Sequence, residues 1–446
     1  MVFDDIFKYS VKEVEKQKHY YDVVALKNTQ KVIAAFRKHQ VSDFYMKSTT
    51  GYAYNDLGRE KLDAIYADIF GTEAALVRSQ FVSGTHALGV AMLGNLNPGD
   101  EVIGATGTPY DTMQSIIGYP NKTPGSLTDT GITYKEIPMA GNYVDIRAVC
   151  SAITEKTKMV HIQRSCGYSS ERETLDVASI GRLIQEVHKV RKDIICFVDN
   201  CYGEFTEVNE PTDYGADLMA GSLIKNVGGG LAPTGGYVVG RKNLVYNAAC
   251  RLTVPGLAGE MGATLGDTAR EFYQGLFMAP HVVMQAVKTA VYAAAVFRKL
   301  GYKVKPKHEE IRHDIIQSIT LNNAKNLENF CAAVQLNSPV DAHVTPVPDF
   351  LPGYQDKVIM AAGTFVQGSS IELSADGPMR EPYNVYLQGG LTYEHGQLAI
   401  NAAAQLIGEA AGRKKKSKAT GDIILDGEKD KTILKACEDI IKTKND

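Results

Sequence analysis

Short apolar runs alternate with helical stretches from about residue 74 to residue 240. Five runs have the length and apolar composition of strands, at residues 76–79, 101–105, 159–163, 194–198 and 237–239. The segments between them are long enough for helices, and this alternation is typical of a sheet whose strands are mostly parallel and connected by helices. The sequence therefore predicts an α/β fold with helices on both faces of a mixed, mostly parallel sheet.

Two charged residues lie between the fourth and fifth strand-forming regions of this pattern. Asp199 ends the run at 194–198, and Lys225 lies among small and apolar residues just before three glycines, at 228–230. Burial favours the neutral form of an amine, and a neutral lysine can form a Schiff base with an aldehyde. Pyridoxal phosphate requires such an amine together with an anion for its pyridine nitrogen. Lys225 alone could instead end a helix and reach solvent, but Asp199 favours the cofactor site.

A hydroxyl-rich turn and a tyrosine precede that pair. Ser83, Gly84 and Thr85 stand where an apolar helix begins, and a helix N-terminus favours an anion such as phosphate. The same residues could also be an ordinary helix cap. Tyr110 follows the second strand candidate, where it could stack on a flat aromatic ring or close a turn.

Length and composition limit the class of protein. A chain of 446 residues is long enough for two domains, and its net charge of −3 gives no electrostatic reason to expect nucleic acid or a membrane as partner. Seven cysteines without Cys-x-x-Cys spacing predict reduced thiols rather than disulfides or a metal site. The first residues lack a basic region followed by an apolar one, so we expect a soluble, cytoplasmic protein.

Changes in pattern along the chain predict four segments. These are a helical arm at 1–50, a large cofactor-binding domain at 51–279, a smaller α+β domain at 280–411, and a basic tail with a short helix at 412–446. In the smaller domain we expect a buried helix starting at Pro280, a helix at 311–334, and strands at 358–360 and 371–373.

Three motifs tie the chain to a known family. Residues 51–60, 82–87 and 386–395 resemble those of the methionine gamma-lyase-like, or aluminium-resistance, family. That family belongs to the fold-type I pyridoxal-phosphate enzymes and is related to cystathionine beta-lyases and gamma-synthases. The resemblance runs from the first residues to about Leu406 and leaves out the tail.

The resemblance implies a role for each matching residue. Lys225 would bind the cofactor aldehyde, Asp199 would pair with the pyridine nitrogen, and Tyr110 would stack on the ring. The other implied contacts are Gly84, Thr85 and Ser222 to the phosphate, Ser83 to the cofactor, Tyr54 and Arg59 to the phosphate of the neighbouring subunit, and Arg380 to the substrate carboxylate. A homodimer or homotetramer with shared active sites would follow.

The implied activity is carbon–sulfur bond cleavage by β- or γ-elimination. The expected substrate is cystathionine, cysteine or methionine, and the products are a thiol, a keto acid and ammonia. The same lysine, aspartate and phosphate turn also serve aminotransferases and aldolases, so these remain alternatives. A third alternative is a protein without catalytic activity that acts in metal tolerance through its tail.

Overall fold

The computed structural model describes residues 3–52, 56–169, 172–351 and 354–410. Its larger sheet has seven strands: β1 (Ala74–Arg78), β2 (Glu101–Gly104), β3 (Thr133–Glu136), β4 (Thr157–Gln163), β5 (Ile195–Asp199), β6 (Leu218–Ser222) and β7 (Gly236–Gly240). They lie in the order β1-β7-β6-β5-β4-β2-β3, and β7 is antiparallel to both of its neighbours. The mixed, mostly parallel sheet predicted from the sequence is confirmed.

Helices cover both faces of this sheet because successive side chains of a strand point to opposite sides. In β5, Ile195 and Phe197 pack in the core that contains α3 (Gly84–Asn95) and α7 (Lys242–Leu252). Cys196 and Val198, which alternate with them, pack in the core that contains α6 (Val177–Val190). The run at 194–198 is apolar throughout because both faces of the strand are buried.

The second sheet is antiparallel and has five strands: β8 (Lys303–Lys305), β9 (Ile316–Thr320), β10 (Val358–Ala361), β11 (Ser374–Pro378) and β12 (Asn384–Gln388). Their order is β10-β11-β12-β9-β8, and α9 (Ala324–Leu336) and α10 (Tyr393–Ala410) pack together beside them. The strand predicted at 358–360 is confirmed as β10.

Two predictions for this region are wrong. The predicted helix at 311–334 is divided into β9 and α9, because Asn323 caps a new helix by accepting a hydrogen bond from the backbone N–H of Asn326. Residues 371–373, predicted as a strand, lie just before β11, which begins at Ser374. Both errors concern short apolar runs, for which periodicity distinguishes helix from strand poorly.

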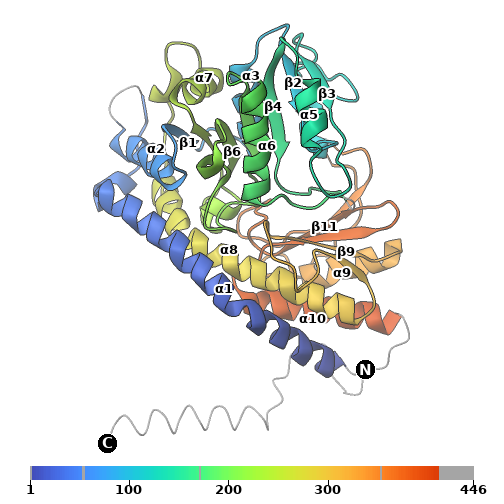
Figure 1. Ribbon diagram of the computed structural model, residues 1–446. Helices are drawn as coiled ribbons and strands as arrows, with labels where there is room; N and C mark the ends of the chain where they lie inside the picture. The colour runs from blue at the N-terminus through green and yellow to red at the C-terminus, as the bar shows by residue number, and fades with distance from the viewer. Residues whose placement is uncertain (1–2, 53–55, 170–171, 352–353, 411–446) are drawn as a thin grey trace, which may run out of the picture.

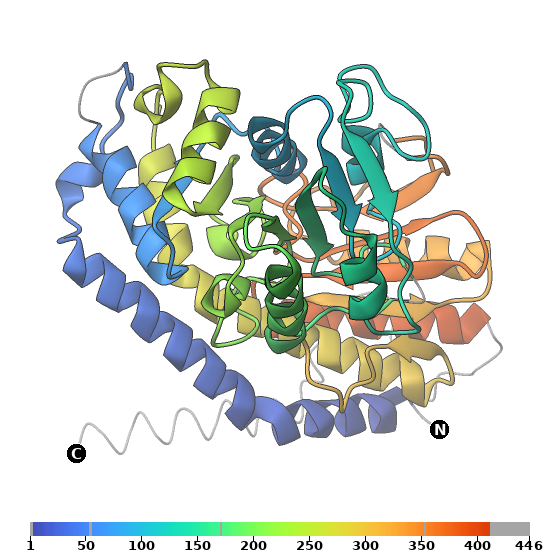
Figure 2. The ribbon, with the colours of Figure 1, turned by 45° about the horizontal axis from the view of Figure 1, so that its top comes forward.

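Long helices link the two halves. α1 (Phe3–Lys38) and α8 (Thr268–Lys299) run side by side along one edge of the molecule, with α10 next to α8 (Figures 1 and 2). Pro280 does not start a helix as predicted, because α8 begins at Thr268 and carries Pro280 inside it. The apolar stretch from 281 to 297 is buried, as predicted, and this packing maintains the helix despite the missing N–H. The predicted domain boundary at residue 280 thus falls within a continuous helix.

The remaining elements are short or peripheral. They are η1 (Asp43–Met46), α2 (Leu57–Ile69), α4 (Asp111–Ile117), α5 (Ile146–Ala152), η2 (Pro211–Tyr214), η3 (Asn226–Gly228) and η4 (Ala258–Glu260). Among the helices of the described ranges, none is long and apolar enough to cross a membrane.

Candidate functional site

The carboxyl ends of β5 and β6 bring three of the predicted residues to one edge of the large sheet. The two strands are parallel neighbours, with Asp199 opposite Ala220. β5 ends at Asp199, β6 ends at Ser222, and Lys225 follows at the start of η3. Ligands of open α/β sheets bind at this edge, so the topology supports a site here.

Lys225 is half-buried and faces an aromatic ring. Its Nζ lies 3.9 Å from the centroid of the Tyr202 ring. Burial lowers the pKa of this amine, but the acidic groups around it, which include Asp199 and Glu204, outweigh burial and raise the pKa above its ordinary value. The expectation that burial would leave Lys225 neutral is therefore wrong, because the acidic groups around Lys225 stabilise its ammonium form.

The predicted phosphate turn lies against the end of β6. Ser83 caps α3 by accepting a hydrogen bond from the His86 N–H at 3.0 Å. A Cβ added to Gly84 would lie 2.7 Å from the Ser222 Cβ, and the buried Ser222 Oγ has no hydrogen-bond partner in the described part of the chain. Thr85 Oγ1 lies 3.2 Å from Thr112 Oγ1. These small and hydroxyl groups surround the N-terminus of α3.

Asp199 is buried near the loop that follows β5 and near His161 of β4. Its Oδ1 accepts a hydrogen bond from the Cys201 N–H at 3.0 Å. His161, on β4, stacks on Phe197 with the ring centroids 5.7 Å apart. Burial lowers the pKa of His161 to about 4, although the charge of Asp199 opposes this shift. At neutral pH, His161 is therefore a neutral neighbour of the Asp199 carboxylate.

Tyr110 is held at the same edge by a side chain of β4. Its backbone N–H donates to Gln163 Oε1 at 2.9 Å, and Gln163 lies opposite Asp199 in the strand register. The Tyr110 hydroxyl forms a hydrogen bond with the Tyr354 hydroxyl. Gln163 thus positions the predicted stacking residue next to the predicted pyridine partner.

The structure does not show three other predicted residues at this edge of the sheet. Tyr54 lies outside the described residues. The Arg59 guanidinium donates to the backbone carbonyls of Gly51, Gly262 and Glu260 in its own chain, so it ties together two loops. Arg380 is half exposed and pairs with Asp356 at 2.5 Å. Their predicted roles with phosphate and substrate stay predictions.

Comparisons with known proteins define the family. The sequence profile of the methionine gamma-lyase family matches residues 3–408. The chain belongs to the methionine gamma-lyase family. It is 50% identical over 382 residues to the uncharacterized protein YnbB of Bacillus subtilis, covering 85% of this chain and 90% of that protein. It is 23% identical over 240 residues to an L-methionine gamma-lyase of Pseudomonas deceptionensis, about half of each chain.

Solved structures agree with this family assignment. A Listeria monocytogenes protein, described as a candidate cystathionine beta-lyase involved in aluminum resistance, is 47% identical and has a TM-score of 0.88 over 91% of this chain and all of its own. A carbon–sulfur lyase involved in aluminum resistance from Clostridium novyi is 45% identical, with a TM-score of 0.86 over 91% of this chain and 96% of its own. At 15% identity, the pyridoxal-5'-phosphate-dependent protein YhfS of Escherichia coli shares the fold, with a TM-score of 0.57 over 87% of this chain and 96% of its own. The predicted fold-type I architecture is confirmed.

Sequence reasoning missed several residues of this family member's site. Tyr168, Tyr202 and Tyr354 come from loops and Asp376 comes from the second sheet, and except for Tyr202 no local motif marks them. Tyr202 alone had a local signal, since it follows Asp199 by three positions. Its φ of 73° is unusual for a tyrosine, and strained backbone of this kind concentrates at functional sites.

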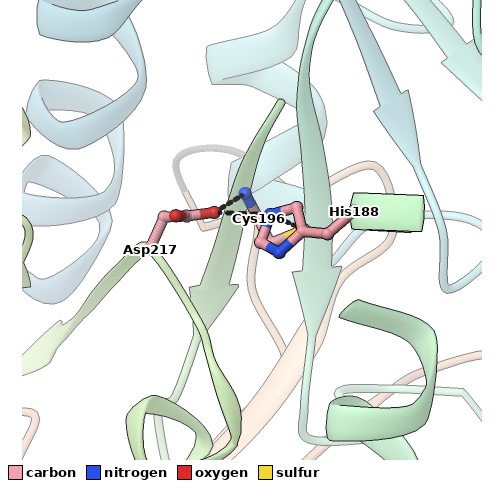
Figure 3. Close-up of side chains that lie close together, drawn as sticks. All are labelled: His188, Cys196 and Asp217. Atoms are coloured by element: carbon pink, nitrogen blue, oxygen red, sulfur yellow. Dashed lines mark hydrogen bonds and ion pairs between the residues drawn. The ribbon is translucent and has the colours of Figure 1, made fainter. Parts of the chain in front are cut away.

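A cluster with metal-ligand chemistry lies at the opposite end of β5 and β6. His188, Cys196 and Asp217 place one ligand atom each within 4.8 Å of one another (Figure 3). However, Asp217 Oδ2 already accepts from the Cys196 N–H at 2.8 Å and lies 3.1 Å from His188 Nε2, while Oδ1 lies 3.3 Å from Arg241 Nη1. Burial raises the pKa of the Cys196 thiol well above its usual range. The cluster is therefore a polar anchor between α6 and the sheet.

Proposed function

We propose that the chain is a pyridoxal-phosphate-dependent carbon–sulfur lyase acting on a sulfur amino acid. The expected reaction is β- or γ-elimination from cystathionine, cysteine or methionine, which yields a thiol, a keto acid and ammonia. The observation that carries the proposal is the placement of Lys225 and Asp199 on adjoining strand ends, beside the N-terminus of α3. Membership of the methionine gamma-lyase family supports the reaction class.

The residues at this edge fit pyridoxal phosphate. Ser222 Oγ is buried without a hydrogen-bond partner among the described residues, and Gly84 leaves space that a Cβ would fill. A phosphate at the α3 N-terminus would accept a hydrogen bond from this hydroxyl and from the backbone amides of the first turn. The buried Asp199 carboxylate supplies the anion that a pyridine nitrogen requires.

Lys225 would have two roles in catalysis. When bound, the cofactor supplies an aldehyde for the amine and a ring that stabilises charge at the substrate α-carbon. Lys225 Nζ would hold that aldehyde until the amino acid displaces it, and the freed amine would then accept the α-proton.

We further propose that the site is completed by a second copy of the chain. Ser83 and Thr85 open on a surface groove that also contains Val82, of which 78% is exposed, and Arg251. Leu93 and Ile116 line the same groove, so its apolar lining extends beyond one side chain and favours coverage by another surface. Tyr54 and Arg59 of the neighbouring copy are the residues proposed to reach the phosphate.

The lyase proposal is tested by incubating the cofactor-loaded protein with cystathionine, cysteine and methionine. We expect keto acid and thiol in equal amounts from at least one of them. Lys225→Ala should abolish the reaction, while Lys189→Ala, on an exposed ion pair, should not change it. Borohydride reduction followed by peptide mapping should label Lys225. Finding neither product with any thioether contradicts the proposal, and amino-group transfer to an added keto acid would favour an aminotransferase.

A mixing experiment tests the shared site. Lys225→Ala and Arg59→Ala proteins should each be inactive, but dissociating and reassociating them together should restore about a quarter of the activity, since one site in each mixed dimer has both residues. No recovery from mixed dimers contradicts a site shared between copies.

A further inference from the structure

Asp376 is a buried carboxyl group with one poorly satisfied oxygen. It lies in β11, opposite Tyr386 of β12, and only 7% of the residue is exposed. Its Oδ2 accepts a hydrogen bond from Gln388 Nε2 at 2.8 Å, and the Tyr168 hydroxyl also donates to the carboxyl group. Within the described ranges, Oδ1 has no hydrogen-bond partner of good geometry. A buried carboxylate without a cation is costly, so this position requires a functional or structural reason.

Aromatic rings separate this carboxyl group from the large sheet. The Tyr168 ring centroid lies 5.4 Å from that of Tyr110 and 5.8 Å from that of Tyr354. Burial raises the pKa of the hydroxyls of both Tyr110 and Tyr168, and the negative charge of Asp376 raises it further. The Asp376 charge therefore acts inside the candidate site, although the residue belongs to the second sheet.

Lys225 is the cation whose charge acts on Asp376. Its charge acts to lower the pKa of Asp376, but burial is stronger and raises that pKa to about 6, so the group is mostly ionised at neutral pH. Under the proposed function, Lys225 is occupied by the cofactor. The site would then contain a carboxylate and several electron-rich ring faces, and among the described residues no ion pair with Asp376 would balance them.

We propose that Asp376 and the tyrosines around it bind a second ammonium group, carried by the side chain of the substrate. Carboxylates and aromatic faces together are the groups that recognise alkylammonium ions. The inference rests on the proposed function and narrows its substrate class. Thioether amino acids whose side chain carries an ammonium group, as that of cystathionine does beside its second carboxylate, would be preferred over those whose side chain ends in an alkyl group, such as methionine.

Binding of two isosteric amino acids tests this inference without relying on catalysis. Ornithine and norleucine differ only in whether the side chain ends in an ammonium or a methyl group. Calorimetric titration of the cofactor-loaded wild-type protein should show ornithine binding at least about tenfold more tightly, as expected for a charge-assisted contact. Asp376→Asn should remove most of this preference and leave norleucine binding within about twofold of wild type.

Two controls separate recognition of the ammonium from general damage. Asp376→Glu keeps the charge and should keep a preference for ornithine, and Asp349→Asn, on the exposed part of the same domain, should behave as wild type. Equal binding of the two ligands by the wild-type protein overturns the inference, and this measurement needs no variant to fold. Equal weakening of both ligands in Asp376→Asn also overturns it, since Asp376 would then act on a group that both ligands share.

Catalysis by the same enzyme separates this inference from the proposed function. S-(2-aminoethyl)cysteine and S-propylcysteine repeat the ammonium–methyl comparison in cleavable thioethers. Cleavage of both at equal kcat/KM, together with equal binding of ornithine and norleucine, supports the lyase and overturns the inference. Cleavage of neither, with the ornithine preference intact, contradicts the lyase and supports the ammonium site.

Discussion

Gly84 and Ser222 approach so closely that a Cβ at position 84 would lie 2.7 Å from the Ser222 Cβ. This contact joins the first turn of α3 to the end of β6, and in the described part of the chain the buried Ser222 hydroxyl has no hydrogen-bond partner. A bound phosphate would satisfy that hydroxyl, so the two residues together define where the phosphate can sit.

We predict that Gly84→Ala and Ser222→Ala both weaken cofactor binding, for different reasons. The added methyl group would push α3 away from β6, whereas the serine variant removes only one hydrogen bond to a charged ligand. A hydrogen bond of this kind contributes about 1.5–3 kcal/mol, so Ser222→Ala should raise the cofactor Kd by about tenfold or more. Equilibrium dialysis measures this change, and Ser179→Ala on α6 serves as the control. Unchanged affinity in both variants would contradict the phosphate site.

The raised pKa of Lys225 predicts that cofactor loading depends on pH. Only the neutral amine attacks an aldehyde, and its fraction rises about tenfold for each pH unit below the pKa. The rate of loading of the cofactor-free protein should therefore increase steadily from pH 6.5 to pH 9, as followed by absorbance. Asp199→Asn removes one of the charges that hold the proton, so its rate should rise at lower pH than that of wild type. A rate independent of pH in wild type would show that Lys225 is already neutral.

The residues at the edge of the large sheet could be predicted from the sequence, but the other residues of the candidate site could not. Asp199 and Lys225 could be placed together because apolar strands buried on both faces are easy to recognise, and parallel strands end at the same edge. Tyr354 and Asp376 could not, since they come from the part of the chain that forms the second sheet, more than 100 residues after Lys225 in the sequence. The charge state of Lys225 was mispredicted for a related reason, because the acidic groups near it are brought there by the fold.

The His188–Asp217 pair should make stability depend on pH. The hydrogen bond with Asp217 raises the pKa of His188, despite partial burial. A raised pKa in the folded state gives stability that is fully present below the unfolded value of 6.5 and is lost as pH rises through the folded value. Urea unfolding should therefore show His188→Gln to be less stable than wild type by about 1 kcal/mol more at pH 6 than at pH 8.5. The exposed His19→Gln should show no such difference, and a larger gap at pH 8.5 would contradict the assignment.

Substitutions of Arg380 and Asp356 test whether Arg380 binds the substrate carboxylate, because they should change KM in opposite directions. Arg380 pairs with Asp356 at 2.5 Å, so a substrate carboxylate bound by this arginine would compete with the aspartate. Arg380→Ala should then raise KM by about tenfold or more with little change in kcat, because a charge-assisted contact is lost from ground state and transition state alike. Asp356→Asn should lower KM, since it frees the guanidinium. If both variants lower stability and leave KM unchanged, Arg380 only anchors the turn between β11 and β12, and another cation must hold the substrate.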